Sequence, residues 1–347
     1  MTNTLKANII SVLLSLTFTF ALLVILITVI GKDPVEVFSL IYSDVFASGY
    51  GIGQTLFKAT PLIFISCGLA ICFHASIFNI GAEGQLNAGS FVMALTAVSM
   101  QSLPFALQLL LSMLAGFFAA GLSGLIPALI KVKKGVSEVI TTIMMNFVIL
   151  ALVNYLMVDF FAVKSTLRTA SIPDTSLFTK ASAVFPFFEG SSLNISFVLA
   201  ILTALAVYVI IYKTTFGYRL RAVGFNETAS KYLGINVNRA ILVSFFAGAG
   251  ITALAGVNFI FGYKGYYEFG FSNNIGFTAI AVSLLARNNP IGIIFSSLLF
   301  AALDYGGLAV NQVVPKEVML LVQGLIIISI LASDSIVKNH YNKKGAV

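Results

Sequence analysis

Apolar stretches long enough to cross a membrane recur along almost the whole chain. They lie near residues 8–30, 52–73, 84–100, 104–130, 136–158, 195–213, 239–262, 291–310 and 316–336. A transmembrane helix needs about 20 such residues, and a shorter run at 274–286 predicts a tenth span or a re-entrant helix. Only 10% of the 347 residues are charged, against roughly 25% in an ordinary soluble domain. The sequence therefore predicts an all-α integral membrane protein with about ten transmembrane helices.

The lysines and arginines test this count, because they collect in cytoplasmic loops. If ten helices cross the membrane and both termini are cytoplasmic, 13 of the 20 basic residues fall on the inner side. The other seven, among them Lys58 and Lys264, fall on the outer side. This pattern favours both termini in the cytoplasm. It explains the net charge of +7 by orientation and by anionic membrane lipid, without a nucleic acid partner.

Two connecting segments are long enough to carry structure of their own. Segment 159–194 falls on the extracytoplasmic side and contains Pro173 and Pro186, which predict either short irregular structure over the outer mouth or a plain connector. Segment 214–238 falls on the cytoplasmic side. The rest of 1–347 is interpreted as a single transmembrane domain.

The cytoplasmic segment carries the pattern of a short, capped helix. Gly224 permits a turn, Asn226 suits an N-cap, and Glu227 places negative charge in the first helical turn. A helix over 227–233 would end at Gly234, which suits a left-handed cap. Such a helix either docks on a partner or lies as an amphipathic connector on the membrane surface.

A polar segment interrupts the apolar sequence at Phe78–Leu86, which reads Phe-Asn-Ile-Gly-Ala-Glu-Gly-Gln-Leu. Unpaired polar groups are costly in a membrane, and glycines allow a helix to break. Asn79-Ile80-Gly81 has a weak echo in Asn274-Ile275-Gly276, and paired breaks of this kind point to a site between internal repeats. We expect Phe78–Leu86 to form a hinge or an inner gate beside a transport pathway.

Polar side chains inside the predicted spans are candidates for function, because they are rare there. The candidates for a translocation path or gate are Asn79, Glu83, Gln85, Thr142, Asn146, Asn154, Asn258 and Asp304. Glu83 and Gln85 either line the path or support the helix break. Asn146 and Asn154 fall about 80° apart on one helix, so they either face a pore or bond to neighbouring helices. Asp304 should face water or a partner.

Several classes of chemistry lack the residues that they need. Cys67 and Cys72 lie in one apolar run at the spacing of neighbouring helical turns, which indicates buried apolar residues. His74 and His340 are too few and too far apart to suggest a metal site. No Gly-x-x-x-x-Gly-Lys-Ser/Thr phosphate loop occurs. The sequence therefore predicts no catalytic residue, no metal and no cofactor bound by this chain.

Four stretches together resemble the permease subunit of bacterial ABC importers for simple sugars and nucleosides. They are Phe78–Leu86, Ser137–Asn146 (Ser-Glu-Val-Ile-Thr-Thr-Ile-Met-Met-Asn), Arg221–Ile235 and Gly276–Pro290. The likeness covers about residues 50–336, and Ser137–Asn146 favours the nucleoside branch. Gly276–Pro290 departs from the family pattern, because Thr278 and Ala286-Arg287 stand where an acidic or small residue and a Gly-Gly pair are usual.

The resemblance implies that 214–238 contains a coupling helix, which docks on a cytoplasmic ABC ATPase that uses ATP-Mg. The docking residues would be Arg221, Gly224, Asn226, Glu227, Ala229, Tyr232 and Gly234. It also implies a second permease subunit, identical or paralogous, and an extracytoplasmic substrate-binding lipoprotein. The expected location is the bacterial cytoplasmic (inner) membrane.

Other interpretations remain open at this stage. Nucleosides are the leading substrates, but a simple sugar or a riboflavin-like compound would use the same architecture. An ion-coupled secondary transporter would bind its driving ion at Glu83, Glu138 or Asp304 and would work without ATP. An intramembrane enzyme would need a nucleophile with a base or a metal cluster, and the sequence displays neither.

Overall fold

The computed structural model describes residues 17–18, 20–311, 313–315, 318, 321, 323–326 and 328–329. This part of the chain is helical, with two isolated β-bridges. The longer helices are α2 (Pro34–Phe46), α3 (Gly49–His74), α4 (Ala82–Ser99), α5 (Phe105–Lys134), α6 (Glu138–Leu156), α7 (Ser196–Lys213), α8 (Thr215–Phe225), α10 (Val237–Ala253), α12 (Ile275–Leu285) and α13 (Pro290–Ala309). Short ones are α9 (Glu227–Tyr232) and α11 (Gly256–Phe259). Two π-helices, η1 (Met157–Phe161) and η5 (Ile260–Lys264), extend α6 and α11.

Six segments of the described chain are long and apolar enough to cross a membrane. They are Gly49–His74, Phe105–Lys134, Glu138–Phe161, Ser196–Lys213, Val237–Lys264 and Pro290–Ala309. Phe20–Val29 and Ile275–Leu285 are apolar but shorter. The predicted span 316–336 and both termini lie largely outside the described residues, so ten spans with both termini in the cytoplasm stay a prediction.

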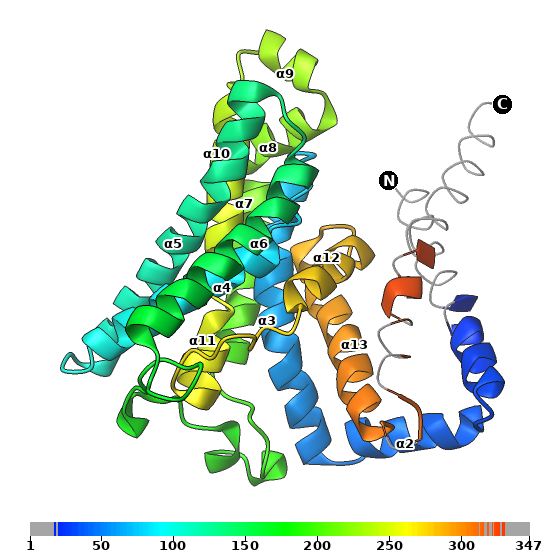
Figure 1. Ribbon diagram of the computed structural model, residues 1–347. Coiled ribbons are helices and arrows are strands. Elements are labelled where there is room, and N and C mark those ends of the chain that lie inside the picture. Colours follow the sequence, from blue (N-terminus) through cyan, green and yellow to red (C-terminus); the bar gives the residue numbers. More distant parts are fainter. Residues whose placement is uncertain are drawn as a thin grey trace, which may run out of the picture.

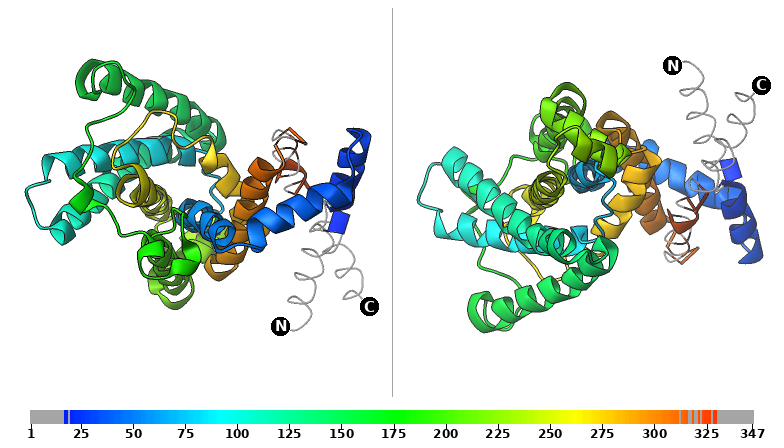
Figure 2. Two further views of the ribbon diagram at one scale, coloured as in Figure 1. Left: turned by 90° about the horizontal axis from the view of Figure 1, so that it is seen from below. Right: turned by 90° about the horizontal axis from the view of Figure 1, so that it is seen from above.

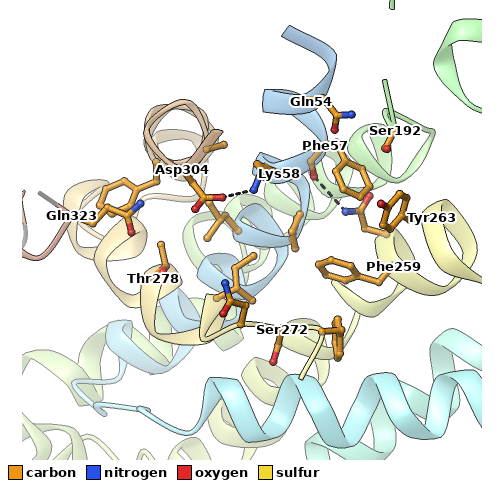
Figure 3. A pocket seen from close by; sticks show the side chains of 18 residues that line it. Gln54, Phe57, Lys58, Ser192, Phe259, Tyr263, Ser272, Thr278, Asp304 and Gln323 are labelled. Carbon is orange, nitrogen blue, oxygen red and sulfur yellow. Dashed lines mark hydrogen bonds and ion pairs between the residues drawn. The ribbon is translucent and has the colours of Figure 1, made fainter. Parts of the chain in front are cut away.

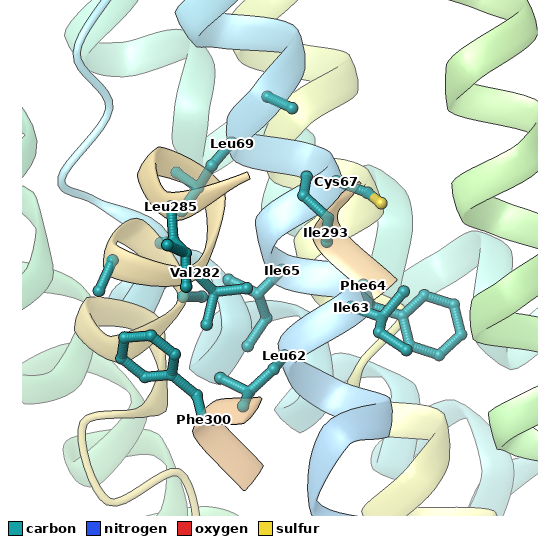
Figure 4. Close-up of a cluster of buried hydrophobic side chains, with 14 of the residues drawn as sticks. Leu62, Ile63, Phe64, Ile65, Cys67, Leu69, Val282, Leu285, Ile293 and Phe300 are labelled. Carbon is teal, nitrogen blue, oxygen red and sulfur yellow. The ribbon is translucent and has the colours of Figure 1, made fainter. Parts of the chain in front are cut away.

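Helix α3 forms the centre of the bundle. It is apolar on all sides, as expected of a helix buried all round, and most of its residues from Ala59 to Cys72 are buried. Figures 1 and 2 place it between the side formed by α5 and α6 and the side formed by α12 and α13. Its apolar side chains pack against Val282 and Leu285 of α12 and against Ile293 and Phe300 of α13 (Figure 4).

The two ends of the bundle differ in structure. Helices α8 and α9 lie together at one end, and α2 lies across the other end together with the loop that follows η1 (Figure 1). We call these the α9 end and the α2 end. The loop contains three short 3₁₀ segments, Asp174–Ser176, Ala181–Ala183 and Pro186–Phe188, as its prolines predict.

Two features of these ends were not anticipated from the sequence. Helix α2 was missed, although Asp33 caps it through a bond from the Val35 amide and a proline occupies its first position. Gly224 lies inside α8 and does not make the predicted turn. An added Cβ at Gly224 would lie 2.2 Å from the His74 carbonyl oxygen, so the glycine allows α8 to contact the end of α3.

Glycines also bring α3 and α10 into backbone contact. An added Cβ at Gly68 would lie 2.3 Å from the Gly248 carbonyl oxygen, and one at Gly248 would lie 2.7 Å from the Gly68 carbonyl oxygen. Small residues permit this close approach of helices in membranes.

We predict that Gly248→Ala lowers the thermal unfolding temperature of the purified protein in detergent. The new methyl group meets backbone atoms, which cannot move away, and overpacking of this kind costs about 1–3 kcal/mol. Gly324→Ala is the matched control, because an added Cβ there meets nothing within 4 Å. Equal unfolding temperatures for the two variants would contradict the proposed contact.

Candidate functional site

A cavity of about 390 Å³ opens beside α3, within the range of roughly 300–1,000 Å³ that is common for small-molecule sites. It is lined by α3, α11, η5, α12, α13 and the loop before α12, together with Ser192 and Gln323. The α3 residues that line the cavity lie in the first half of that helix. The cavity therefore lies in the half of the bundle near the α2 end. Its two walls differ in chemistry.

One wall is aromatic and the other is polar (Figure 3). Phe57, Phe259 and Tyr263 form the aromatic wall, and the rings of Phe57 and Tyr263 lie 5.4 Å apart. The polar wall contains Lys58, Thr278, Asp304 and Gln323, and Gln54 lies beside Phe57. The cavity therefore suits a permeant that has a flat apolar part and several hydrogen-bonding groups.

Pro61 of α3 explains why a buried amide stands on the aromatic side of the cavity. Proline has no N–H, so the carbonyl of Phe57, four residues earlier, loses its helical partner. The Asn258 side chain donates to this carbonyl at 3.3 Å. Its Oδ1 accepts from the Ser196 hydroxyl at 2.7 Å. Asn258 thereby satisfies the break in α3 and joins it to α7.

Lys58 and Asp304 form an ion pair on the polar wall, with Nζ and Oδ2 at 2.5 Å. The pair joins α3 to α13 across 246 residues of sequence. The sequence analysis placed Lys58 in an outer loop, and the structure corrects this: Lys58 lies within the apolar segment Gly49–His74. Asp304 has the partner that its carboxylate required.

The polar segment after α3 is a non-helical stretch whose backbone is hydrogen-bonded by one face of α6. Glu138, Thr142 and Asn146 lie four residues apart, which places them on the same face of a helix. Glu138 accepts from the Phe78 amide, and Thr142 accepts from the Ile80 amide at 3.2 Å.

Asn146 completes this pairing. Its Nδ2 donates to the Ile80 carbonyl at 2.8 Å, and its Oδ1 accepts from the Gly84 amide at 2.9 Å. Asn79 and Gln85 exchange two side-chain hydrogen bonds within the same break. Side chains thus pair the Phe78, Ile80, Gly81 and Gly84 amides and the Ile80 carbonyl, as irregular structure inside a membrane requires.

The two breaks noted in the sequence meet at Glu83. The Glu83 carboxylate accepts from the Gly276 amide at 2.8 Å and from the Ser272 hydroxyl. Gly276 lies in the first turn of α12, whose amides have no partner inside that helix, so Glu83 of α4 caps α12. An added Cβ at Gly276 would lie 2.5 Å from the Glu83 nitrogen. Ser272 lines the cavity, which places this junction directly behind the cavity wall.

A chain of hydrogen bonds continues from the junction toward the α2 end. The Asn87 Nδ2 donates to Ser272 at 3.0 Å, and its Oδ1 accepts from the Tyr267 hydroxyl at 2.8 Å. Burial raises the pKa of Tyr267, which keeps its hydroxyl protonated as a donor. The Tyr267 amide donates to Thr169 of the long loop. The loop over the α2 end is therefore connected to Glu83.

The second candidate site is the exposed α9 end. The Asn226 side chain accepts from the Ala229 amide at 2.9 Å and caps α9, as predicted. The helix ends at Tyr232, and Gly234 follows its C-cap Leu233 in the predicted left-handed conformation. Phe225, Tyr232 and Leu233 are strongly exposed there. An exposed apolar surface around a six-residue helix marks a contact site.

Comparison with known proteins identifies the family. Residues 51–331 match the family described as the permease component of branched-chain amino acid transport systems. The chain belongs to this permease family. No solved structure shows a significant match.

The permease is similar to three characterised relatives over most of its length. It is 32% identical to the nucleoside ABC transporter permease protein NupB of Lactococcus lactis, over 91% of this chain and 88% of the relative. It is 32% identical to the guanosine ABC transporter permease protein NupP of Bacillus subtilis, over 93% of both chains. It is 30% identical to the glucose ABC transporter permease protein TsgB13 of Haloferax volcanii, over 88% of this chain and 82% of the relative. With its six apolar spans, the permease is a multi-pass membrane protein.

The sequence-predicted path residues of the permease fall into three groups. Asn258 and Asp304 line the cavity. The second group consists of residues that hydrogen-bond in or beside the break before α4. They are Asn79, Glu83, Gln85, Thr142 and Asn146, all of which are buried. Asn154 is exposed on α6 and does not share the buried face of Asn146. Asn146 makes the interhelical hydrogen bonds that were one of its two interpretations.

Sequence reasoning missed most of the cavity wall. The missed residues are Gln54, Phe57, Lys58, Phe259, Tyr263, Thr278 and Gln323. Lys58 carried a usable signal, because it is a lysine within the apolar run 52–73. Pro61 carried another, because a proline inside a helix frees the carbonyl four residues earlier.

We predict that Asn146→Leu destabilises the permease and that Asn154→Leu does not. The first change leaves the Ile80 carbonyl and the Gly84 amide buried without partners, at about 1–3 kcal/mol for each group. The second replaces an exposed side chain of the same type on the same helix. Thermal unfolding in detergent measures both, and a larger effect at Asn154 would contradict the pairing described for α6.

A second prediction concerns Pro61. Asn258→Ala should destabilise the natural protein, because the Phe57 carbonyl loses its donor. In a Pro61→Ala background the helix supplies that donor again, so the same change should cost less, by about 1 kcal/mol. A double-mutant cycle of unfolding free energies measures this coupling, and additive effects would refute it.

Proposed function

We propose that this chain is the translocation subunit of an ATP-driven ABC importer that takes up nucleosides. The observation that carries the proposal is the cavity, which has an aromatic wall opposite a polar wall. A nucleoside has a flat base for the aromatic wall and a hydroxylated sugar for the polar wall. Two similar permeases are named for nucleosides and for guanosine, which supports the same substrate class.

The proposed orientation places the α9 end in the cytoplasm, as the distribution of basic residues favours. Helix α9 is then the coupling helix, docked on a separate ATPase that hydrolyses ATP-Mg. The cavity lies on the extracytoplasmic side, where a substrate-binding lipoprotein delivers the permeant. A second permease subunit, identical or paralogous, completes the pathway, and ten spans remain the expected topology.

In this arrangement the junction at Glu83 acts as the inner gate. It lies directly behind the cavity wall, and it joins the first turns of two helices by hydrogen bonds to one carboxylate. A sliding displacement of either helix along the other breaks these bonds and opens the wall. Glu83 is therefore proposed to support the gate and not to contact the permeant.

The function is tested by reconstituting the permease with its ATPase and binding protein in liposomes. Tritiated guanosine should accumulate when ATP is present and should not accumulate with a proton or sodium gradient alone. Uptake driven by a gradient without ATP would indicate a secondary transporter. ATP-driven uptake of glucose but not of guanosine would assign a sugar as the substrate.

We predict that Tyr232→Ala and Glu227→Ala reduce both the recovery of the ATPase with the purified permease and nucleoside uptake. Tyr232 is exposed on α9, and loss of an aromatic anchor at a protein interface costs roughly 2 kcal/mol or more. Tyr155→Ala is the matched control, because Tyr155 is also exposed but lies at the far end of α6. Unchanged recovery and uptake would contradict the placement of the coupling helix.

A further inference from the structure

We infer that Asp304 is the acceptor for the hydroxyl groups of the permeant and that Lys58 positions its carboxylate. The inference rests on the proposed function, because it takes the cavity as the transport site. It assigns a specificity-determining role to a residue pair that joins α3 and α13 on the polar wall.

The geometry leaves one side of the carboxylate available. Oδ2 of Asp304 binds the Lys58 ammonium at 2.5 Å, and Oδ1 has no hydrogen-bond partner among the described residues. Half of the Asp304 side chain is accessible, at 50%, against 29% for Lys58. Both residues line the cavity, and Figure 3 shows the pair on the wall opposite Phe259 and Tyr263.

The three ion pairs of the described chain differ in what surrounds them. Lys131 pairs with Glu138 at the α9 end, and Lys264 pairs with Glu268 near the α2 end. Only the pair of Lys58 and Asp304 lines the cavity. Both of its members lie within apolar spans, where a charge without a partner is costly and marks a functional site.

The chemistry of the pair suits a neutral, hydroxylated permeant. A carboxylate accepts several hydrogen bonds, and a bond from a hydroxyl group to an ionised acceptor is stronger than a bond between neutral groups. Lys58 holds the carboxylate in place and balances its charge, so the wall attracts no free cation. The result is a fixed acceptor for sugar hydroxyls.

Neighbouring amides add polar groups to the cavity. The side chains of Gln54 and Gln323 line the cavity and have no hydrogen-bond partner among the described residues. Gln323 lies next to Asp304, and Gln54 lies beside Phe57 (Figure 3). A sugar placed against Asp304 meets further polar groups, while the base that it carries lies toward Phe57 and Tyr263.

The test compares guanosine with 2′,3′-dideoxyguanosine, which lacks the 2′- and 3′-hydroxyls that would donate hydrogen bonds to Asp304. Uptake of each tritiated compound is measured in liposomes with ATP, the ATPase and the unchanged binding protein. Because the binding protein is the same throughout, its own preference cancels when variants are compared. The natural permease should transport guanosine more efficiently than Asp304→Asn does. The two proteins should transport dideoxyguanosine equally well.

The expected result is a fall of about tenfold or more in the ratio of guanosine to dideoxyguanosine uptake efficiency in Asp304→Asn. Asp159→Asn, an exposed acid at the end of α6, should leave the ratio unchanged. An equal loss for both compounds, or no loss, overturns the inference. Failure of the natural permease to transport either compound overturns the proposed function instead.

A charge-swapped variant separates recognition from structural support. Lys58→Asp combined with Asp304→Lys keeps an ion pair between α3 and α13 but moves the carboxylate to α3. If Asp304 recognises hydroxyls, the swap restores the thermal unfolding temperature lost in Lys58→Met and leaves the uptake ratio low. Recovery of the natural ratio in the swapped variant would show that the pair is only a structural tie.

Discussion

The hydrogen bonds between α6 and the non-helical backbone of 75–81 are the constraint on which the rest of the site depends. A membrane offers no water to an unwound backbone, so this stretch can lie inside the bundle only because Glu138, Thr142 and Asn146 pair with it. The pairing lets α4 begin inside the bundle, and that start brings Glu83 to the first turn of α12. The wall of the cavity is built on this contact.

Local chemistry is why parts of the structure could be predicted from the sequence. Hydropathy located α3 to α7, α10, α12 and α13 closely, because a spanning helix is specified by its own residues. Asn226 and Gly234 were assigned as caps of α9 for the same reason. The breaks before α4 and α12 were also visible, as polar residues and glycines in apolar sequence. Their meeting at Glu83 was suggested only by a weak three-residue echo.

Contacts between distant residues account for what could not be predicted. No sequence pattern near Asp304 indicates that Lys58 is its partner, because 246 residues separate the two. Counting Lys58 as a loop residue concealed the signal that its position in an apolar run gave. A glycine at position 224 is compatible with a turn or with close packing of two helices. Only the position of the carboxyl end of α3 decides between these two roles. The cavity walls combine six separate segments of the sequence, which no local pattern specifies.

The capping of α12 by Glu83 restricts how the two halves of the molecule can move. Hydrogen bonds to a carboxylate depend on direction, and the glycine at 276 leaves no side chain between the two backbones. Helix α12 can therefore rotate about this point but cannot slide along α4 without losing both bonds. The junction has the mechanical character of a pivot, so a large displacement far from it produces only a small change of distance at the carboxylate.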